Sequence, residues 1–297
     1  MNFKHIATMA SGQDGAIFGS LLFRFNAKGQ CRVYDLSQID MAAEPTELQA
    51  IATFTLDRAE EIVPHSNAVC FGTEYADPAD EFPLLYSNIY NNYAKTENKR
   101  KGVCCVYRLQ RAGDSFKTTL VQLIEIGFTE DSALWCSVGG EDVRPYGNFT
   151  VDRQRGLYWA FVMRDATRTT RYFSFRLPKL TDGTPDGEFG VNRVTLTSAD
   201  ILSQFDCDYH DFVQGACTHD SKIYSVEGFH ADGKHPPAMR VIDTVAGVQE
   251  RYIDLVAHNC LIEPECIDFI GENCYYSDAH GALYLVEFET SRRRFEK

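Results

Sequence analysis

The stretch HDFVQGACTHDSKIYSVEGF, residues 210–229, decides the fold class of this 297-residue chain. It opens with polar residues, continues into a short apolar run, turns near Asp220, and ends in a second run around Tyr224. Short apolar and aromatic runs bounded by Gly, Asp and Asn are typical of β-strands. Long patterns at helical spacing are missing from the sequence, so the stretch indicates one β-hairpin of an all-β protein.

The same hairpin pattern recurs four more times along the chain. Such a repeat has to be found early because it fixes the architecture. The other copies are GQDGAIFGSLLFRF at 12–25, HSNAVCFG at 65–72 with FPLLYSNIY at 82–90, YGNFTVDRQRGLYWAF at 146–161, and EPECIDFIGENCYYSD at 263–278. A third strand-like run follows each copy: CRVYDL, GVCCVYRL, RYFSFRL, AMRVIDT and ALYLVEF. Five similar sheets are therefore predicted.

A fourth run completes the sheet in four of the five copies. The four runs are LQAIATFTLD at 48–57, TTLVQLIEIGF at 118–128, NRVTLTSADIL at 192–202 and QERYIDLV at 249–256. The fifth copy lacks one, whereas NFKHIATMA at 2–10 precedes the first copy. If that N-terminal strand pairs with the last copy, it closes a ring and protects the sheet edges. The pattern predicts a five-bladed β-propeller, with residues 1–297 as a single domain.

The blade lengths support this count and leave one alternative. Gln13, Ser66, Tyr146, Gln214 and Glu265 stand at equivalent positions, about 53, 80, 68 and 51 residues apart, and about 45 through the joined termini. Propeller blades take roughly 40 to 50 residues, so the second and third carry insertions. A six-bladed propeller, with a degenerate blade between residues 90 and 145, is the alternative.

The charge balance excludes several classes of partner. The chain has 29 basic and 42 acidic residues, a net charge of −13. Nucleic acids and anionic membranes need a basic face, so neither partner is expected. No run approaches the roughly 20 apolar residues of a membrane span, and residues 1–15 lack the apolar core of a signal peptide. We expect a cytoplasmic protein, or a secreted or periplasmic one if a signal peptide has been removed.

The ten cysteines are scattered, and most stand in apolar, strand-like runs. A free cysteine behaves as a small buried apolar residue, so buried thiols are expected rather than disulfides. The sequence contains neither a C-x-x-C pair nor an H-E-x-x-H motif. No metal site and no cofactor are therefore predicted.

The predicted site of function is one mouth of the central channel, where the segments leading into the first strand of each blade meet. Polar residues are frequent in those segments. The ligand-binding candidates are Asp14, His65, Asn67, Arg144, Tyr146, Asn148, His210, Gln214, Glu263 and Glu265. The competing interpretation is structural: these groups satisfy buried backbone atoms and hold channel water.

The repeat resembles the five-bladed glycoside hydrolases of the arabinanase and levansucrase-like type. That resemblance implies three acidic residues on the inner strands of the first blades, acting as nucleophile or base, pKa modulator and general acid. Only Asp14 stands at such a place; the next copies offer Asn67 and Asn148, while Glu141 and Asp142 come too early. The starts VQGACTHDSKIY and EPECIDFIGENCYY also resemble helveticin-like and teichoic-acid-associated bacterial propellers, which implies no defined chemistry.

Three hypotheses of function follow. The first is a non-enzymatic propeller that binds a small polar molecule or glycan at the channel mouth. The second is a glycoside hydrolase or lyase that uses carboxylates among Asp14, Asp142, Glu263 and Glu265, one of them with a pKa raised by burial. The third is a protein-interaction scaffold that uses its outer loops.

Overall fold

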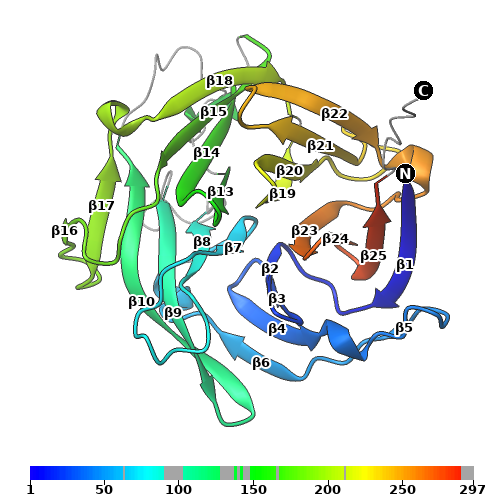
Figure 1. The fold of residues 1–297 in the computed structure, drawn as a ribbon, viewed down its shortest axis with the longest axis horizontal. Helices are drawn as coiled ribbons and strands as arrows, with labels where there is room; N and C mark the ends of the chain where they lie inside the picture. Colours follow the sequence, from blue (N-terminus) through cyan, green and yellow to red (C-terminus); the bar gives the residue numbers. More distant parts are fainter. Residues whose placement is uncertain are drawn as a thin grey trace, which may run out of the picture.

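The computed structural model describes residues 1–62, 64–89, 103–127, 148–164, 167–210 and 212–288, together with the backbone of 137–138 and 141–142. Within these residues, five β-sheets stand as blades around a common axis (Figure 1). The predicted all-β, five-bladed propeller is confirmed. Among the described residues, none of the helices has the length and apolar character needed to cross a lipid bilayer.

Each blade is built outward from a first strand at the axis, and sequential strands pair antiparallel. Blade 1 consists of β2 (Gly15–Phe18), β3 (Leu21–Phe25), β4 (Gln30–Asp35) and β6 (Ala52–Thr55). Blade 2 begins with β7 (Val69–Phe71), β8 (Leu85–Ile89), β9 (Val103–Ala112) and β10 (Ser115–Ile126). Blade 3 consists of β13 (Asn148–Asp152), β14 (Leu157–Arg164), β15 (Thr169–Arg176) and β18 (Ser203–Asp208).

The remaining blades follow the same order. Blade 4 consists of β19 (Val213–His219), β20 (Lys222–Glu227), β21 (Ala238–Asp243) and β22 (Val248–Asp254). Blade 5 consists of β23 (Pro264–Ile270), β24 (Asn273–Asp278), β25 (Ala282–Glu287), β1 (Asn2–Thr8) and the short β5 (Thr46–Glu47). Outside the blades are β11 (Ser137–Val138), β12 (Glu141–Asp142), α1 (Ala59–Ile62), η1 (Leu36–Gln38), η4 (Ser198–Asp200) and η5 (Val256–His258).

The N-terminal strand closes the ring as the sequence predicts. β1 pairs antiparallel with β25, with Phe3 opposite Val286 and Lys4 opposite Leu285. The outer edge of β1 pairs in parallel with β5 at Ala7 and Thr8. Strands from both ends of the chain therefore share one sheet, so separating them would open the ring.

One predicted strand belongs to a different blade. Asn192–Leu196 was expected as the fourth strand of the third copy, but that place is taken by β18, and the prediction is wrong. Asn192–Leu196 instead forms β17, which pairs in parallel with β10 of blade 2 and carries β16 (Thr184–Pro185) on its outer edge. Figure 1 shows β16 and β17 outside β10. Blade 2 thus has six strands.

Contacts made by the insertion that precedes β17 explain why this strand joins blade 2. Gln122 of β10 donates its amide to the carbonyl of Lys179 at 2.7 Å, and the Leu180 N–H donates to the Glu74 carboxylate at 2.8 Å. Arg193 then pairs with Glu125 of β10 at 3.0 Å. These contacts hold the insertion against blade 2, so the strand that follows it joins that sheet.

The long interval behind the six-bladed alternative contains no further blade among its described residues. Between residues 90 and 145 the structure describes the long β9–β10 hairpin of blade 2 and the two-residue strands β11 and β12. In the described part of this interval, the extra length lies in strand extension and adds no repeat.

The hydrophobic core lies between neighbouring blades. Blades 1 and 2 share a cluster in which Phe23 contacts Phe71, Phe82 and Phe116 edge to face at 5.3–5.5 Å between ring centroids. A fully buried aromatic side chain of this kind contributes about 2 to 3 kcal/mol through burial. Because each seam has its own cluster, every blade depends on the blades beside it.

The nine described cysteines are all free thiols, and all but Cys70 are buried. Burial raises the pKa of these thiols, as at Cys104 and Cys274. The expected buried thiols are therefore confirmed for the described part of the chain. A protonated, buried thiol acts here as a packing group.

Candidate functional site

The channel is lined by the five first strands β2, β7, β13, β19 and β23, each in contact with the first strands of its neighbours. These strands run in one direction along the axis, which gives the channel two distinct mouths. We call the end where they begin the N-terminal mouth, formed around Asp14, Asn67, Asn148, Gln214 and Glu265. We call the end where they finish the C-terminal mouth. Those predicted ligand residues that the structure describes lie toward the N-terminal mouth.

At the N-terminal mouth the strands pack closely around Gly215. A Cβ atom at this position would lie 2.3 Å from the backbone oxygen of Glu265 and 3.0 Å from Oδ1 of Asp14. Only glycine allows three strands of different blades to approach so closely. Asp14 is fully buried, and its Oδ2 accepts the N–H of Val69 in blade 2 at 2.8 Å. Asp14 therefore joins blades across the axis.

Burial raises the pKa of Asp14 well above its ordinary value. The N–H groups of Val69 and Gly15 oppose the rise, and the nearby Asp268 adds to it. Such a carboxyl group holds its proton more readily than one in water. Its role in the described geometry is to satisfy a buried backbone donor.

Two amide–carboxylate bonds join neighbouring blades at the same mouth. The side-chain amide of Gln13 donates to Oε1 of Glu265 at 2.9 Å, and that of Gln214 donates to Oε1 of Glu263 at 2.8 Å. Burial raises the pKa of Glu265, and repulsion from the charge of Glu263 adds to the rise. Burial likewise raises the pKa of Glu263. The two predicted carboxylates are therefore engaged by glutamines.

His210 is part of the core between blades 3 and 4. It is fully buried, its Nε2 lies 3.2 Å from the Tyr172 hydroxyl, and its Nδ1 lies 3.5 Å from Glu227. Arg240 donates twice to Glu227, at 2.8 and 3.0 Å. Burial, with help from the charge of Arg240, lowers the pKa of His210. A neutral imidazole inside this network ties the two blades together.

Three more of the predicted residues, all within the described part of the chain, lie near the same mouth. Buried Asn67 accepts the amide of Asn88 at 2.6 Å, and buried Asn148 is 3.9 Å from the Met163 sulfur. His65 is partly buried, which lowers its pKa. Arg144 and Tyr146 lie outside the described residues. Asp142, proposed for acid–base chemistry, ends the two-residue strand β12.

The C-terminal mouth holds a cavity of about 420 Å³ to which all five blades contribute. The final residues of the first strands and the turns after them form its wall; one from each blade is Ile17, Thr73, Arg153, Thr218 and Asp268. Cavities of this size are typical of small-ligand sites, which generally combine an apolar wall with a few convergent polar groups. None of these residues was among the predicted ligand residues.

Asp268 is one of three acidic residues in the cavity wall, beside Asp152 and Asp220. Its carboxylate accepts the N–H of Ile17 in blade 1 at 2.7 Å and the N–H of Phe269 at 2.8 Å. Burial raises its pKa to about 6, although these bonds and the charge of Arg153 act in the opposite direction. Arg153 lies 5.5 Å from the ring centroid of Phe18. A carboxyl group and a guanidinium therefore stand together in the cavity wall.

A flat ring pair forms another part of the wall. The imidazole of His219 stacks on Phe269 with 4.1 Å between centroids and an angle of 3° between the planes. Gln154, which is exposed, and Thr218 add polar groups beside it. Planar rings next to amides and hydroxyls suit ligands that have both apolar faces and hydroxyl edges.

Asp152 holds the turn that presents Arg153 and Gln154. It is buried, and its carboxylate accepts the backbone N–H groups of Gln154 and Arg155 at 3.0 and 2.9 Å. The Arg155 side chain pairs with the same carboxylate at 2.5 Å. Asp is favoured in turns for such bonds, so the local sequence VDRQRG fixes this part of the wall.

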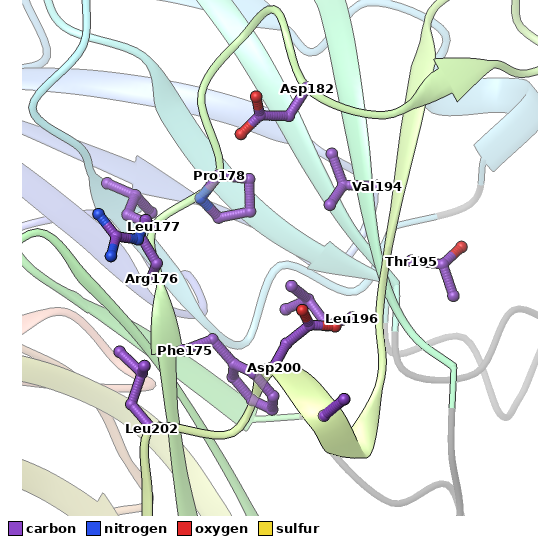
Figure 2. Close-up of a pocket in the computed structure, with 11 residues that line it drawn as sticks. Phe175, Arg176, Leu177, Pro178, Asp182, Val194, Thr195, Leu196, Asp200 and Leu202 are labelled. Carbon is purple, nitrogen blue, oxygen red and sulfur yellow. The ribbon is translucent and has the colours of Figure 1, made fainter.

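A different cavity lies far from the axis, where the β15–β18 edge of blade 3 faces β17 (Figure 2). Its volume is about 370 Å³, and its apolar wall includes Phe175, Leu177, Leu196 and Leu202. This cavity exists because β17 pairs with β10 of blade 2 and does not extend the sheet of blade 3. Among the described residues, no group of three or more His, Cys, Asp and Glu side chains is arranged to hold a metal ion, at this cavity or elsewhere.

Comparison with known proteins gives similarity in fold alone. No protein-family model and no curated protein matches the chain. Glutaminyl cyclase from Myxococcus xanthus is 9% identical over 97% of this chain and 96% of its own, with a TM-score of 0.46. The exo-β-1,3-galactanase from Phanerochaete chrysosporium is 10% identical over 96% of this chain and 63% of its own, with a TM-score of 0.44. These likenesses carry no argument about function.

Proposed function

We propose that this propeller binds a small, neutral, polyhydroxylated molecule such as a mono- or disaccharide, without converting it. The observation that carries the proposal is the cavity of about 420 Å³ at the C-terminal mouth, to which all five blades contribute. Its stacked His219–Phe269 pair supports contact with a sugar face. Its amide, hydroxyl and carboxyl groups support hydrogen bonds to sugar hydroxyls.

The N-terminal mouth is the weaker candidate for the ligand. There, Gln13 and Gln214 already donate to Glu265 and Glu263, and Asp14 accepts a backbone N–H. A ligand that used the bonded atoms would have to replace these bonds, and a buried polar group left without a partner costs about 1 to 3 kcal/mol. The other carboxylate oxygens, Oδ1 of Asp14 and Oε2 of Glu265, have no hydrogen-bond partner among the described residues but are buried away from solvent, so a ligand could reach them only if the packed strands moved. The C-terminal mouth requires no such exchange at Gln154, which is exposed.

Two glutamines make a matched test of the two mouths. Isothermal titration of neutral mono- and disaccharides should identify a ligand, and Gln154→Ala should then raise its Kd about fivefold, the effect of one lost hydrogen bond. Gln13→Ala, at the N-terminal mouth, should leave the Kd unchanged. The opposite pattern would place the ligand at the N-terminal mouth, and no binding by any sugar would refute the proposal.

A glycoside hydrolase or lyase is the second candidate, and one observation favours it. Asp268 has a pKa of about 6 in the cavity, so part of its population is protonated near neutral pH, as a general acid requires. Incubation of the same sugars and their aryl glycosides, followed by chromatography, separates the two candidates. Products that form with the native protein and not with Asp268→Asn would replace the binding proposal with catalysis.

A further inference from the structure

A second cavity continues outward from the one at the C-terminal mouth. It has a volume of about 390 Å³ and lies along the seam between blades 4 and 5. The two cavities share His219, Asp220 and Phe269 in their walls. From there the second one passes Tyr224 of β20 and Val241 of β21 on the blade 4 side. One groove therefore leads from the axis to the rim of the propeller.

The stacked ring pair is the junction between the cavities. His219 lies flat against Phe269, and Tyr224 contacts the same phenylalanine ring at 4.8 Å between centroids, tilted by 60°. Three rings in contact thus follow the groove from the first cavity into the second. A row of aromatic rings suits a chain of repeating units, because each ring offers a separate face for stacking.

The charges along the second cavity select against an anion. Lys222 forms an ion pair with Glu250, two strands away in the same blade, and His219 lies 3.7 Å from Glu272. The wall also includes Asp220, Glu287 and Arg251, so acidic side chains outnumber basic ones and repel an anionic polymer. Lys222 and Arg251 lie among these acids and oppose a cationic polymer, whereas a neutral polymer meets neither kind of repulsion.

From these features, we propose that the groove binds a linear, neutral oligosaccharide, with its end in the C-terminal mouth and its following rings on the blade 4–5 seam. This inference rests on the proposed sugar-binding function and extends it to the length of the ligand. It assigns Tyr224 and Asn273 to specificity for chain length, because they line the second cavity and are absent from the wall of the first.

The test is a chain-length series measured by isothermal titration. Gluco-, xylo-, manno- and arabino-oligosaccharides of one to six units serve as probes. In the series that binds, we expect the Kd to fall at least tenfold between two and four units. Asn273→Trp, which fills the second cavity from an exposed position, should abolish that gain and leave the Kd of the disaccharide unchanged.

Two further variants separate a binding effect from a folding effect. Tyr224→Ala should also abolish the gain with length, although Tyr224 packs on the core and this variant needs a thermal melt beside it. Asp114→Trp adds an indole to the exposed β9–β10 turn, outside both cavities, and should bind like the native protein. Disaccharide binding with no gain in affinity for longer chains would overturn the inference and leave the proposed function standing. If no sugar of any length binds, both fall.

Discussion

The two mouths of the channel are built from the same five strands and differ in how their polar groups are used. At the N-terminal mouth, side chains of different blades bond to one another, as Gln13 does to Glu265 and Gln214 to Glu263. At the C-terminal mouth, Asp152 and Asp268 bond to backbone N–H groups and leave a cavity in front of them. The first arrangement closes the ring of blades, and the second leaves room for a ligand.

The difference follows from where each mouth lies in a blade. The N-terminal mouth receives a connection from the previous blade, so its residues must join two sheets. The C-terminal mouth is made of the connections within single hairpins. In the turn after β13, Asp152 satisfies the backbone N–H groups locally, although Asp268 accepts the N–H of Ile17 in the next blade. Side chains in such turns, including Arg153 and Gln154, are free to vary without loosening the ring. Substitutions at the first mouth should therefore affect stability, and those at the second should affect binding.

The largest effect should come from Gly215→Ala. The added methyl group would meet the Glu265 carbonyl and the Asp14 carboxylate, and the Asp14 carboxylate is held by its bond to Val69 of blade 2. Overpacking at such a point should lower the free energy of unfolding by about 3 kcal/mol, measured by urea denaturation. Gly187→Ala, where nothing lies within 4 Å of the new Cβ, is the control and should change it little. Equal effects would show that the N-terminal mouth is not tightly packed.

A smaller effect should come from Asp14→Ala. It removes the acceptor of the buried Val69 N–H, and an unsatisfied buried donor lowers the free energy of unfolding by about 2 kcal/mol. Asp14→Asn keeps an oxygen acceptor and resembles the protonated carboxyl that burial favours. It should therefore stay within about 1 kcal/mol of the native protein. If Asp14→Asn lowers the free energy of unfolding as much as Asp14→Ala does, the charge of Asp14 matters more than its hydrogen bond.

The number of blades and the ring closure were predictable because both depend on a pattern that repeats along the chain. Residues 2–10 were recognised as the missing strand since the last copy lacked one, and β1 does pair with β25. The sheet joined by Asn192–Leu196 was not predictable in this way. Its strand pattern fits either blade, and the choice is made by Gln122 and Glu74, more than 50 residues away from the backbone atoms that they bind.

Prediction of the candidate site from the sequence was limited in the same way, by contacts between residues that are far apart in the chain. Polar residues before each first strand were read as ligand groups, but whether Glu265 faces a ligand or Gln13 depends on a contact across 252 residues. The turns after the first strands contain Asp152, His219 and Asp220, which are ordinary turn residues on sequence grounds. Only the closed ring brings five such turns around one cavity. Charged residues in the turns of blades 3, 4 and 5, at Arg153, Asp220 and Glu272, were the available signal.

The smallest effect concerns pH and the C-terminal mouth. Asp268 has a pKa of about 6 in the folded protein, against an ordinary value of 3.8. Between these pH values the unfolded chain releases this proton first, so the folded state holds more protons and the native protein loses stability as pH rises. About one pH unit above 6 the loss is nearly complete. Asp268→Asn removes the titration, so its stability relative to the native protein should rise from pH 4 to pH 7 by at most about 2 kcal/mol, and by less because Asp268 is only partly buried.

Urea denaturation of both proteins at half-unit pH steps measures this difference. The variant loses an acceptor for one backbone N–H, which shifts its stability equally at every pH, so only the slope reports the titration. Glu265 also has a raised pKa, but it is present in both proteins and cancels in the comparison. Asp14 does not cancel fully, because Asp268 contributes to its raised pKa, so both proteins should be compared in an Asp14→Asn background. A difference that stays constant from pH 4 to pH 7 would mean that Asp268 ionises as it does in water. The carboxyl group of Asp268 would then be exposed to solvent, which would weaken the assignment of the C-terminal mouth as a ligand cavity.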